Sequence, residues 1–195
     1  MQGFISNDRL KSFSDSVLVV AVVLLVYNLA TLATSEPKFF EFDTFFHALV
    51  AYVSSFIVVF FYWSRFTLLL DHVKSLGDTI VLISLAFLIL VTLTPVSYIG
   101  LLQLRSQTAL IFTSINQILA GGFLVLLWRI VTKDKDKTIG PKARYFFFQI
   151  CLIPLVYIAS LPISYLDFTI AFILPLFILP IFLLIRVRYR KSFNG

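Results

Sequence analysis

Long stretches without a charged residue follow one another along the whole chain, and they constrain its fold more than any other feature. A run of about 18 apolar residues is long enough to cross a bilayer as a helix. The chain is 59% hydrophobic and 13% charged, whereas soluble globular proteins are about 45–50% apolar and about 25% charged. We therefore predict an all-α, polytopic membrane protein with a single domain over residues 1–195. Six transmembrane helices are expected, over residues 16–34, 44–64, 79–104, 106–128, 145–166 and 168–185.

The basic residues predict how these spans are oriented. Lys and Arg are enriched in the cytoplasmic loops of membrane proteins. With six spans, all but two of the 16 basic residues, Lys38 and Arg105, fall on one side of the membrane together with both ends of the chain. We therefore expect both termini in the cytoplasm. The opposite side would carry the acidic residues Glu36, Glu41 and Asp43.

Charged and polar residues stand immediately before the first apolar run, in the order Arg9-Leu-Lys-Ser-Phe13-Ser14-Asp15. Charges are costly in hydrocarbon, so ionisable residues at the edge of a spanning helix are candidates for function. A capping box is a plainer alternative, in which Ser12 caps the helix and Asp15 complements its positive end. A signal peptide is a further alternative, which the acid at position 15 and the length of the apolar run disfavour.

A stripe of residues at helical spacing continues beyond this motif. It consists of Ser16, Val20, Val23, Tyr27 and Thr31, and it is polar at both ends and aliphatic in the middle. Helix packing or contact with lipid would account for such a stripe. A pore wall with hydrated mouths and an apolar constriction would account for it as well, and such constrictions can gate by dewetting. The stripe alone leaves both interpretations open.

The motif R-x-x-x-F-S-D resembles the signature of the transmembrane protein 175 family of potassium channels, matched here by Arg9, Phe13, Ser14 and Asp15. Trp63, near the end of the second span, also resembles the family. The resemblance implies a prokaryotic, single-repeat member that assembles as a homotetramer in the cell (plasma) membrane. It implies a potassium-permeable cation channel rather than an enzyme, with no catalytic residue and no cofactor beyond the permeating K⁺.

The same resemblance implies roles for individual residues. The first helix of each subunit would line the pore, with Val20 and Val23 forming the apolar constriction and Tyr27 lying toward the outer mouth. The residues of the motif would anchor this helix to its neighbours. Four copies of the outer acids Glu36, Glu41 and Asp43 would concentrate cations by field focusing.

This chain departs from the family pattern at two places. A threonine is common where Val23 stands, so a hydroxyl that could touch a permeating ion is missing. Paired histidines often follow the tryptophan of the second span, whereas Trp63 is followed here by Ser64 and Arg65. We expect weaker selectivity for potassium from the first departure, and the loss of histidine support for the motif from the second.

Two other functional classes stay open. A secondary transporter or small-solute permease would act within one protomer and would need a polar cavity, for which Asn116, Gln117 and Thr92 are the candidates. A membrane scaffold protein would conduct nothing. We expect Asn116 and Gln117 to bond between helices, and the adjacent Gly121 and Gly122 to allow close helix approach.

Several site classes are not supported by the sequence. His47 and His72 are far apart and have no second ligand at useful spacing, so we predict no metal site. Cys151 is the single cysteine, which excludes an internal disulfide. The basic residues cluster at the ends of the apolar runs, so nucleic acid is not an expected partner. The expected partners are lipid, monovalent cations and further copies of the chain.

Overall fold

The structure, a computed structural model, describes residues 6–73, 77–104, 106–132 and 141–183. Over these residues every regular element is a helix, and no strand is found. Five helices are long and apolar enough to cross a membrane. They are α1 (Asn7–Ser35), α2 (Phe42–Leu70), α3 (Asp78–Leu104), α4 (Gln107–Thr132) and α5 (Pro141–Ser164). The prediction of an all-α, polytopic membrane protein is thus confirmed at this level.

The predicted sixth span forms a shorter and less regular helix. It begins with α6 (Phe168–Ile173), passes through the 3₁₀ turn η1 (Leu174–Phe177) and is helical again up to residue 183. Pro175 lies in η1, where its missing N–H disrupts the α-helical hydrogen-bond ladder. At the start, the Asp167 carboxylate accepts hydrogen bonds from the Thr169 and Ile170 backbone amides, 2.8 and 3.1 Å away. The predicted end of this span, residue 185, lies outside the described residues.

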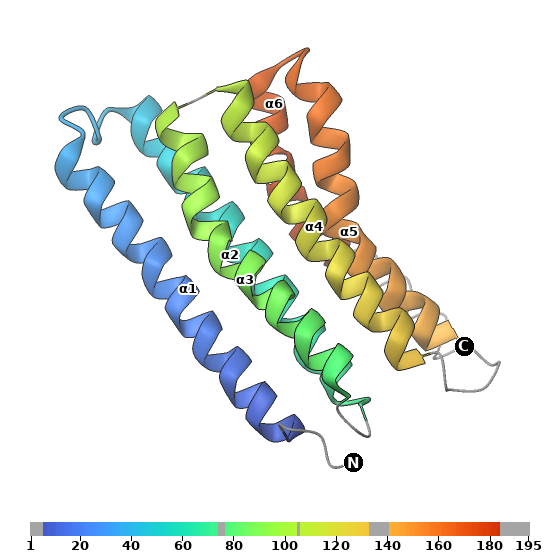
Figure 1. The fold of residues 1–195 in the computed structure, drawn as a ribbon. Helices are drawn as coiled ribbons and strands as arrows, with labels where there is room; N and C mark the ends of the chain where they lie inside the picture. The colour runs from blue at the N-terminus through green and yellow to red at the C-terminus, as the bar shows by residue number, and fades with distance from the viewer. Residues whose placement is uncertain (1–5, 74–76, 105, 133–140, 184–195) are drawn as a thin grey trace.

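The helices form an elongated bundle in which α1 lies at one edge (Figure 1). α1 packs on α2 and α3, α3 packs on α4, and α4 packs on α5. The α1–α2 connection and the α5–α6 turn lie at one end of the bundle, and the start of α1 lies at the other (Figure 1). The location of the termini relative to the cytoplasm stays a prediction, and most of the basic residues behind it lie outside the described residues.

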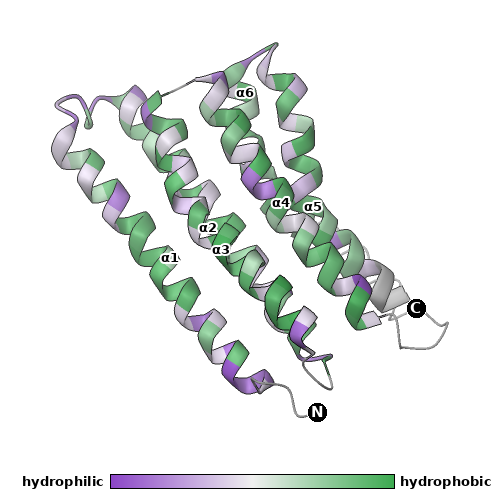
Figure 2. Cartoon of the chain, viewed as in Figure 1, coloured by the Kyte–Doolittle hydropathy of each residue, from purple (hydrophilic) through white to green (hydrophobic). Residues whose placement is uncertain are grey.

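Hydrophobic residues surround the helices instead of following one face of each (Figure 2). A helix that is hydrophobic all round is buried in a large core or in a membrane. The core between α2, α3, α4 and α5 contains large side chains that are fully buried, among them Tyr62, Phe66, Phe87, Leu124 and Ile153. Many equally apolar side chains point outward. This distribution agrees with a bundle whose surrounding medium is lipid.

Candidate pore helix

The first helix begins earlier than its apolar run. α1 starts at Asn7, and the Ser6 hydroxyl caps it by accepting a hydrogen bond from the Arg9 backbone amide at 3.4 Å. Ser12 lies inside the helix, where its backbone carbonyl accepts a hydrogen bond from the Ser16 hydroxyl at 3.0 Å. The capping-box alternative for Ser12 is therefore wrong, because the turn that needs a cap is formed by residues further toward the N-terminus.

Three polar residues spaced four apart, Asn7, Lys11 and Asp15, connect the first half of α1 to the C-terminal part of α2. Residues four apart lie on the same side of a helix. The Asn7 side-chain amide donates to the Leu70 carbonyl at 2.9 Å, and the Lys11 ammonium pairs with the Asp71 carboxylate at 2.5 Å. The first half of α1 is therefore fixed to α2 by side-chain bonds in addition to apolar packing.

The third of these contacts joins the motif to the tryptophan that the sequence singled out. The Trp63 indole N–H donates to the Asp15 carboxylate at 2.8 Å. Within the motif, Ser14 is buried and its hydroxyl donates to the Lys11 carbonyl of the same helix at 2.7 Å. Phe13 is 49% exposed. A connection from the motif to α2 thus exists at Asp15, whereas Ser14 bonds only within its own helix in the part of the chain that the structure describes.

Arg9 behaves differently from Asp15. Its side chain is exposed, and no hydrogen bond or ion pair to it is found among the described residues of the protomer. The predicted anchoring role of Arg9 stays a prediction.

The second half of α1 is held mainly by apolar contacts. Ala21, Leu25 and Leu32 are buried against α2 and α3. One polar contact reaches α3, in which the Asn28 side-chain amide donates to the Pro95 carbonyl at 3.4 Å. This distance is long for a hydrogen bond of this type. The two halves of α1 thus differ in how firmly they are attached.

The stripe predicted to line a pore lies on the uncovered side of α1. Val20 is 54% exposed, Val23 is 59% exposed and Tyr27 is 65% exposed. Only 17% of the apolar window of α1 is buried, less than in any of the other four long helices. In the bundle, α1 has α2 and α3 on one side and no helix on the other (Figure 1). This face is therefore open to lipid or to another subunit.

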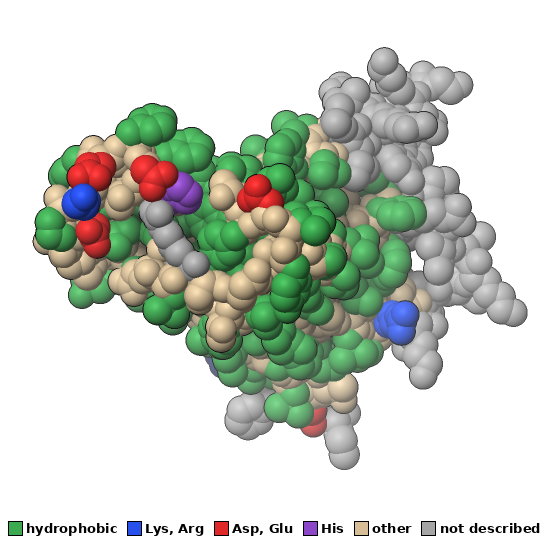
Figure 3. All heavy atoms as spheres, turned by 90° about the horizontal axis from the view of Figure 1, so that it is seen from above, with side chains coloured by type: hydrophobic (Ala, Val, Ile, Leu, Met, Phe, Trp, Pro, Cys, Tyr) green, Lys and Arg blue, Asp and Glu red, His purple; other side chains and the backbone are tan. Residues whose placement is uncertain are grey.

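The predicted outer acids lie around the α1–α2 connection. Glu36, Glu41 and Asp43 are all exposed. Figure 3 shows acidic side chains gathered at one side of this end, next to a basic side chain and a histidine. The Lys38 ammonium lies 3.5 Å from the Glu41 carboxylate, and the His47 Nδ1 lies 3.4 Å from the Asp43 carboxylate. Exposed pairs of this kind are weak. The carboxylates therefore still produce a negative electrostatic potential at this end.

Arg65, two residues after Trp63, contacts a different helix from Trp63. Its guanidinium donates to the Gln149 side-chain carbonyl of α5 and also bonds the neighbouring Ser64 hydroxyl at 3.4 Å. It lies over three phenylalanine rings, with centroid distances of 5.1 to 5.8 Å. Those rings belong to Phe61, Phe146 and Phe182. These contacts attach Arg65 to α5 and to aromatic rings around it, whereas Trp63 contacts the motif on α1.

The two mid-helix amides of α4 bridge neighbouring helices. The Asn116 side chain donates to the Leu90 carbonyl at 3.2 Å, and the Gln117 side chain donates to the Thr94 hydroxyl at 3.1 Å. Both amides are buried, and both partners belong to α3. Thr92 bonds the carbonyl of Ile89 in its own helix at 2.7 Å. The expected bonding between helices is thus confirmed for Asn116 and Gln117.

Metal ligands are not grouped in the part of the chain that the structure describes. No cluster of three or more His, Cys, Asp or Glu side chains is found there. His47 and His72 stand near opposite ends of α2, and each ring bonds a backbone carbonyl four residues earlier.

These features define a class of protein: an all-helical, polytopic membrane protein whose edge helix is tied to its neighbour by polar contacts and leaves an apolar stripe uncovered. Residues 9–95 match the model of a family described as the endosomal/lysosomal potassium channel TMEM175. The match covers most of α1, all of α2 and most of α3. It confirms the resemblance seen in the motif, and the matched family is one of ion channels, not of enzymes.

The fold is also similar to a solved structure. The crystal structure of a protein described as a lysosomal potassium-selective channel TMEM175 homolog, from Chamaesiphon minutus, superposes with a TM-score of 0.71. The superposition covers 95% of this chain and 97% of that chain at 16% sequence identity. At this identity the likeness establishes a shared fold over nearly the whole length. None of the curated proteins compared with the sequence matches it.

Proposed function

We propose that four copies of this chain form a potassium-permeable cation channel in the plasma membrane of a prokaryote, with α1 of each subunit lining a central pore. One observation carries the proposal: α1 leaves Val20, Val23 and Tyr27 uncovered while its other side is fixed to α2 and α3. The matched family and the description of the Chamaesiphon protein as potassium-selective support this choice of ion.

Symmetry explains why an uncovered helix face suits a pore. In a closed ring of identical subunits, the same face of each subunit meets the axis. At about 100° per residue, Val20, Val23 and Tyr27 fall within about 60° of one another. The buried residues Leu25 and Leu32 lie roughly opposite. A subunit placed with its stripe toward the axis would therefore keep its helix contacts intact.

Two further features favour a pore over simple lipid contact. The stripe is bounded by the polar residues Ser16 and Thr31, which lipid contact does not require. The exposed acids Glu36, Glu41 and Asp43 lie around the α1–α2 connection, and of the three stripe residues Tyr27 is nearest to this end of α1. In a tetramer their charges would combine at one mouth and raise the local concentration of cations.

The apolar constriction sets the mechanism of selection. Rings of Val20 and Val23 offer a permeating ion no oxygen atom, so the ion passes by losing part of its hydration shell or by wetting of the constriction. Potassium is less tightly hydrated than sodium and loses water at a lower cost. We therefore propose a modest preference for potassium, set by the radius of the constriction.

Bilayer recording of the purified protein under a potassium/sodium gradient tests the proposal. Unitary ohmic currents and a tetrameric mass are expected. Val23→Asn should raise the conductance, because an amide hydrates the constriction. Val26→Asn is the matched control: Val26 is 51% exposed, and it lies about 60° from Val23 and about 120° from Val20 around the helix.

The outcomes separate the functional classes. If the Val23 variant, the Val26 variant and the parent protein have equal conductance, α1 does not line the pore. Saturable, coupled flux without unitary steps would favour the secondary transporter acting within one protomer. No flux from a well-folded tetramer would leave the scaffold interpretation.

A further inference from the structure

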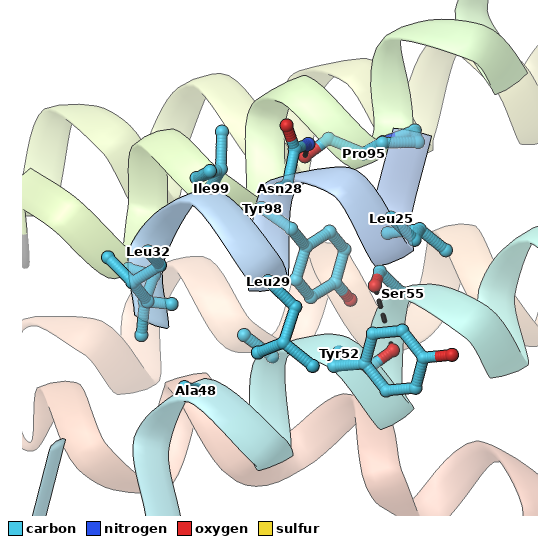
Figure 4. Close-up of a pocket in the computed structure, with 12 residues that line it drawn as sticks. Leu25, Asn28, Leu29, Leu32, Ala48, Tyr52, Ser55, Pro95, Tyr98 and Ile99 are labelled. Atoms are coloured by element: carbon cyan, nitrogen blue, oxygen red, sulfur yellow. Dashed lines mark hydrogen bonds between the residues drawn. The ribbon is translucent and has the colours of Figure 1, made fainter. Parts of the chain in front are cut away.

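A small cavity lies directly behind the second half of α1 (Figure 4). Its volume is about 30 Å³. Three helices line it and leave it partly open, and α1 forms one wall with the side opposite to Val23 and Tyr27. Apolar residues of each helix line it, including Leu25 and Leu29 of α1, Ala48 and Ala51 of α2, and Pro95 and Ile99 of α3.

Three of the polar side chains in the walls have hydrogen-bond partners within the protein. The Asn28 amide donates to the Pro95 carbonyl at 3.4 Å, and the Ser55 hydroxyl donates to the Tyr52 carbonyl at 2.9 Å (Figure 4). The hydroxyl of Tyr98 shares a hydrogen bond with that of Tyr157. A water molecule needs two to four polar partners to occupy a cavity, and apolar cavities stay dry. The cavity therefore suits an apolar guest.

Two alanines create the space. Ala48 and Ala51 are 1% and 4% exposed, and their spacing of three residues places both on the side of α2 that faces α1. Leucine at either position would extend into the cavity. An engineered cavity that binds benzene has a volume of about 150 Å³, so this one, which is about a fifth as large, suits the end of a slender chain better than a ring.

The surrounding medium supplies such a chain. α1, α2 and α3 are all long and apolar enough to cross a membrane. Their outer surfaces would lie in hydrocarbon, where unbranched acyl chains are the most abundant molecules. We propose that the cavity behind α1 binds the terminal carbons of a lipid acyl chain.

The bound chain end would support the second half of α1. This half has one polar contact, the long bond from Asn28, whereas the first half has three. Leu25 and Leu29 lie on the same turns as Val23 and Tyr27, so filling the space behind them fixes the position of the stripe. This consequence for conduction rests on the proposed channel function, and the binding itself does not.

Photolabelling tests the binding. The full chain is reconstituted in vesicles of a phosphatidylcholine that carries a diazirine at the end of one acyl chain, irradiated, digested and analysed by mass spectrometry. Adducts are expected on the peptides that contain Leu29 and Ala51. Ala51→Leu should lower them at least roughly fourfold, because each chain carbon that the leucine displaces contributes a factor of about four to binding. Leu29→Ala enlarges the cavity and should raise them.

Ala159→Leu is the matched control, since this alanine is exposed on α5, a helix that contributes no residue to the cavity wall. Its labelling should equal that of the parent protein. Size-exclusion profiles and thermal melts establish whether each variant is folded. If Ala51→Leu does not fold, the labelling of Leu29→Ala tests the proposed binding instead. Cavity labelling that neither variant changes would overturn the proposal.

Currents provide the separate functional readout. Ala51→Leu fills the space with its own side chain and should leave the open probability close to that of the parent protein, whereas Leu29→Ala removes part of the wall behind the stripe and should alter it. Unchanged gating in Leu29→Ala would overturn the consequence for conduction. A parent protein that is labelled but carries no current would refute the channel and keep the binding site, so the two failures are distinguishable.

Discussion

A single glycine determines how closely α4 approaches α5. A Cβ atom added at Gly121 would lie 2.6 Å from Cγ and 2.8 Å from Cδ of Pro154. Pro154 is inside α5, so its rigid ring cannot rotate away. In contrast, a Cβ atom at the adjacent Gly122 would have nothing within 4 Å. We predict that Gly121→Ala destabilises the protein and that Gly122→Ala stabilises it.

The magnitude follows from comparing the two variants. Carbon atoms attract at about 3.5–4.0 Å, so Gly121→Ala must separate the helices by about 0.9 Å. Overpacking of this kind costs about 1–3 kcal/mol. Both substitutions remove the conformational entropy of glycine, which gains about 0.5–1 kcal/mol within a helix. Since this gain is common to both, the difference in unfolding free energy between Gly121→Ala and Gly122→Ala should be the overpacking cost of about 1–3 kcal/mol.

Denaturation in mixed micelles measures this difference, with helicity followed as the fraction of SDS increases. Gly122→Ala serves as the internal control, because it makes the same chemical change one residue away. Equal unfolding free energies for the two variants would show that α4 and α5 do not pack at this distance. A Gly121→Ala variant that is more stable than the parent protein would refute the reasoning altogether.

Three further changes concern the attachment of α1. Trp63→Phe keeps an aromatic ring but removes the N–H that binds Asp15 at 2.8 Å. Hydrogen bonds to charged groups contribute about 1.5–3 kcal/mol to stability, and because this one is exposed we expect about 1 kcal/mol. The coupling energy of a double-mutant cycle with Asp15→Asn measures it. Lys11→Met should cost at most about 1 kcal/mol, and the cost should vanish at about 1 M salt, where the Debye length is about 3 Å. Asn28→Leu removes a bond of 3.4 Å and should change the unfolding free energy by about 0.5 kcal/mol, with limited proteolysis cutting the second half of α1 faster than the first.

The helices could be predicted from the sequence because hydropathy reports on length and environment together. The spans predicted at 16–34, 44–64 and 79–104 lie inside α1, α2 and α3. Hydropathy identifies the segment of a helix that lies in the hydrocarbon. It does not show how far the backbone hydrogen bonds of the helix extend beyond that segment. The polar residues from Asn7 to Asp15 therefore belong to α1 although they precede its apolar run. The ends of the helices were accordingly less predictable than their presence.

Contacts between helices were predictable only in part. The motif and Trp63 could be singled out from the family resemblance, and Asp15 and Trp63 are in fact bonded. The ion pair between Lys11 and Asp71 gave no signal, because the two residues are far apart in the sequence and lie on different helices. Gly121 and its neighbour look alike in sequence, and only the position of α5 distinguishes them.

The unequal attachment of α1 has a consequence for gating in the proposed channel. Three polar contacts hold the first half of the helix to α2, and the last of them is at Asp15. Beyond Asp15 the helix is held by apolar contacts, by one long bond at Asn28 and by walls that line a partly open cavity. Apolar packing is not directional, so the second half can shift at a lower cost than the first. Movement of the pore would then concentrate at Val23 and Tyr27, whereas the motif would hold its position and set the orientation of the helix.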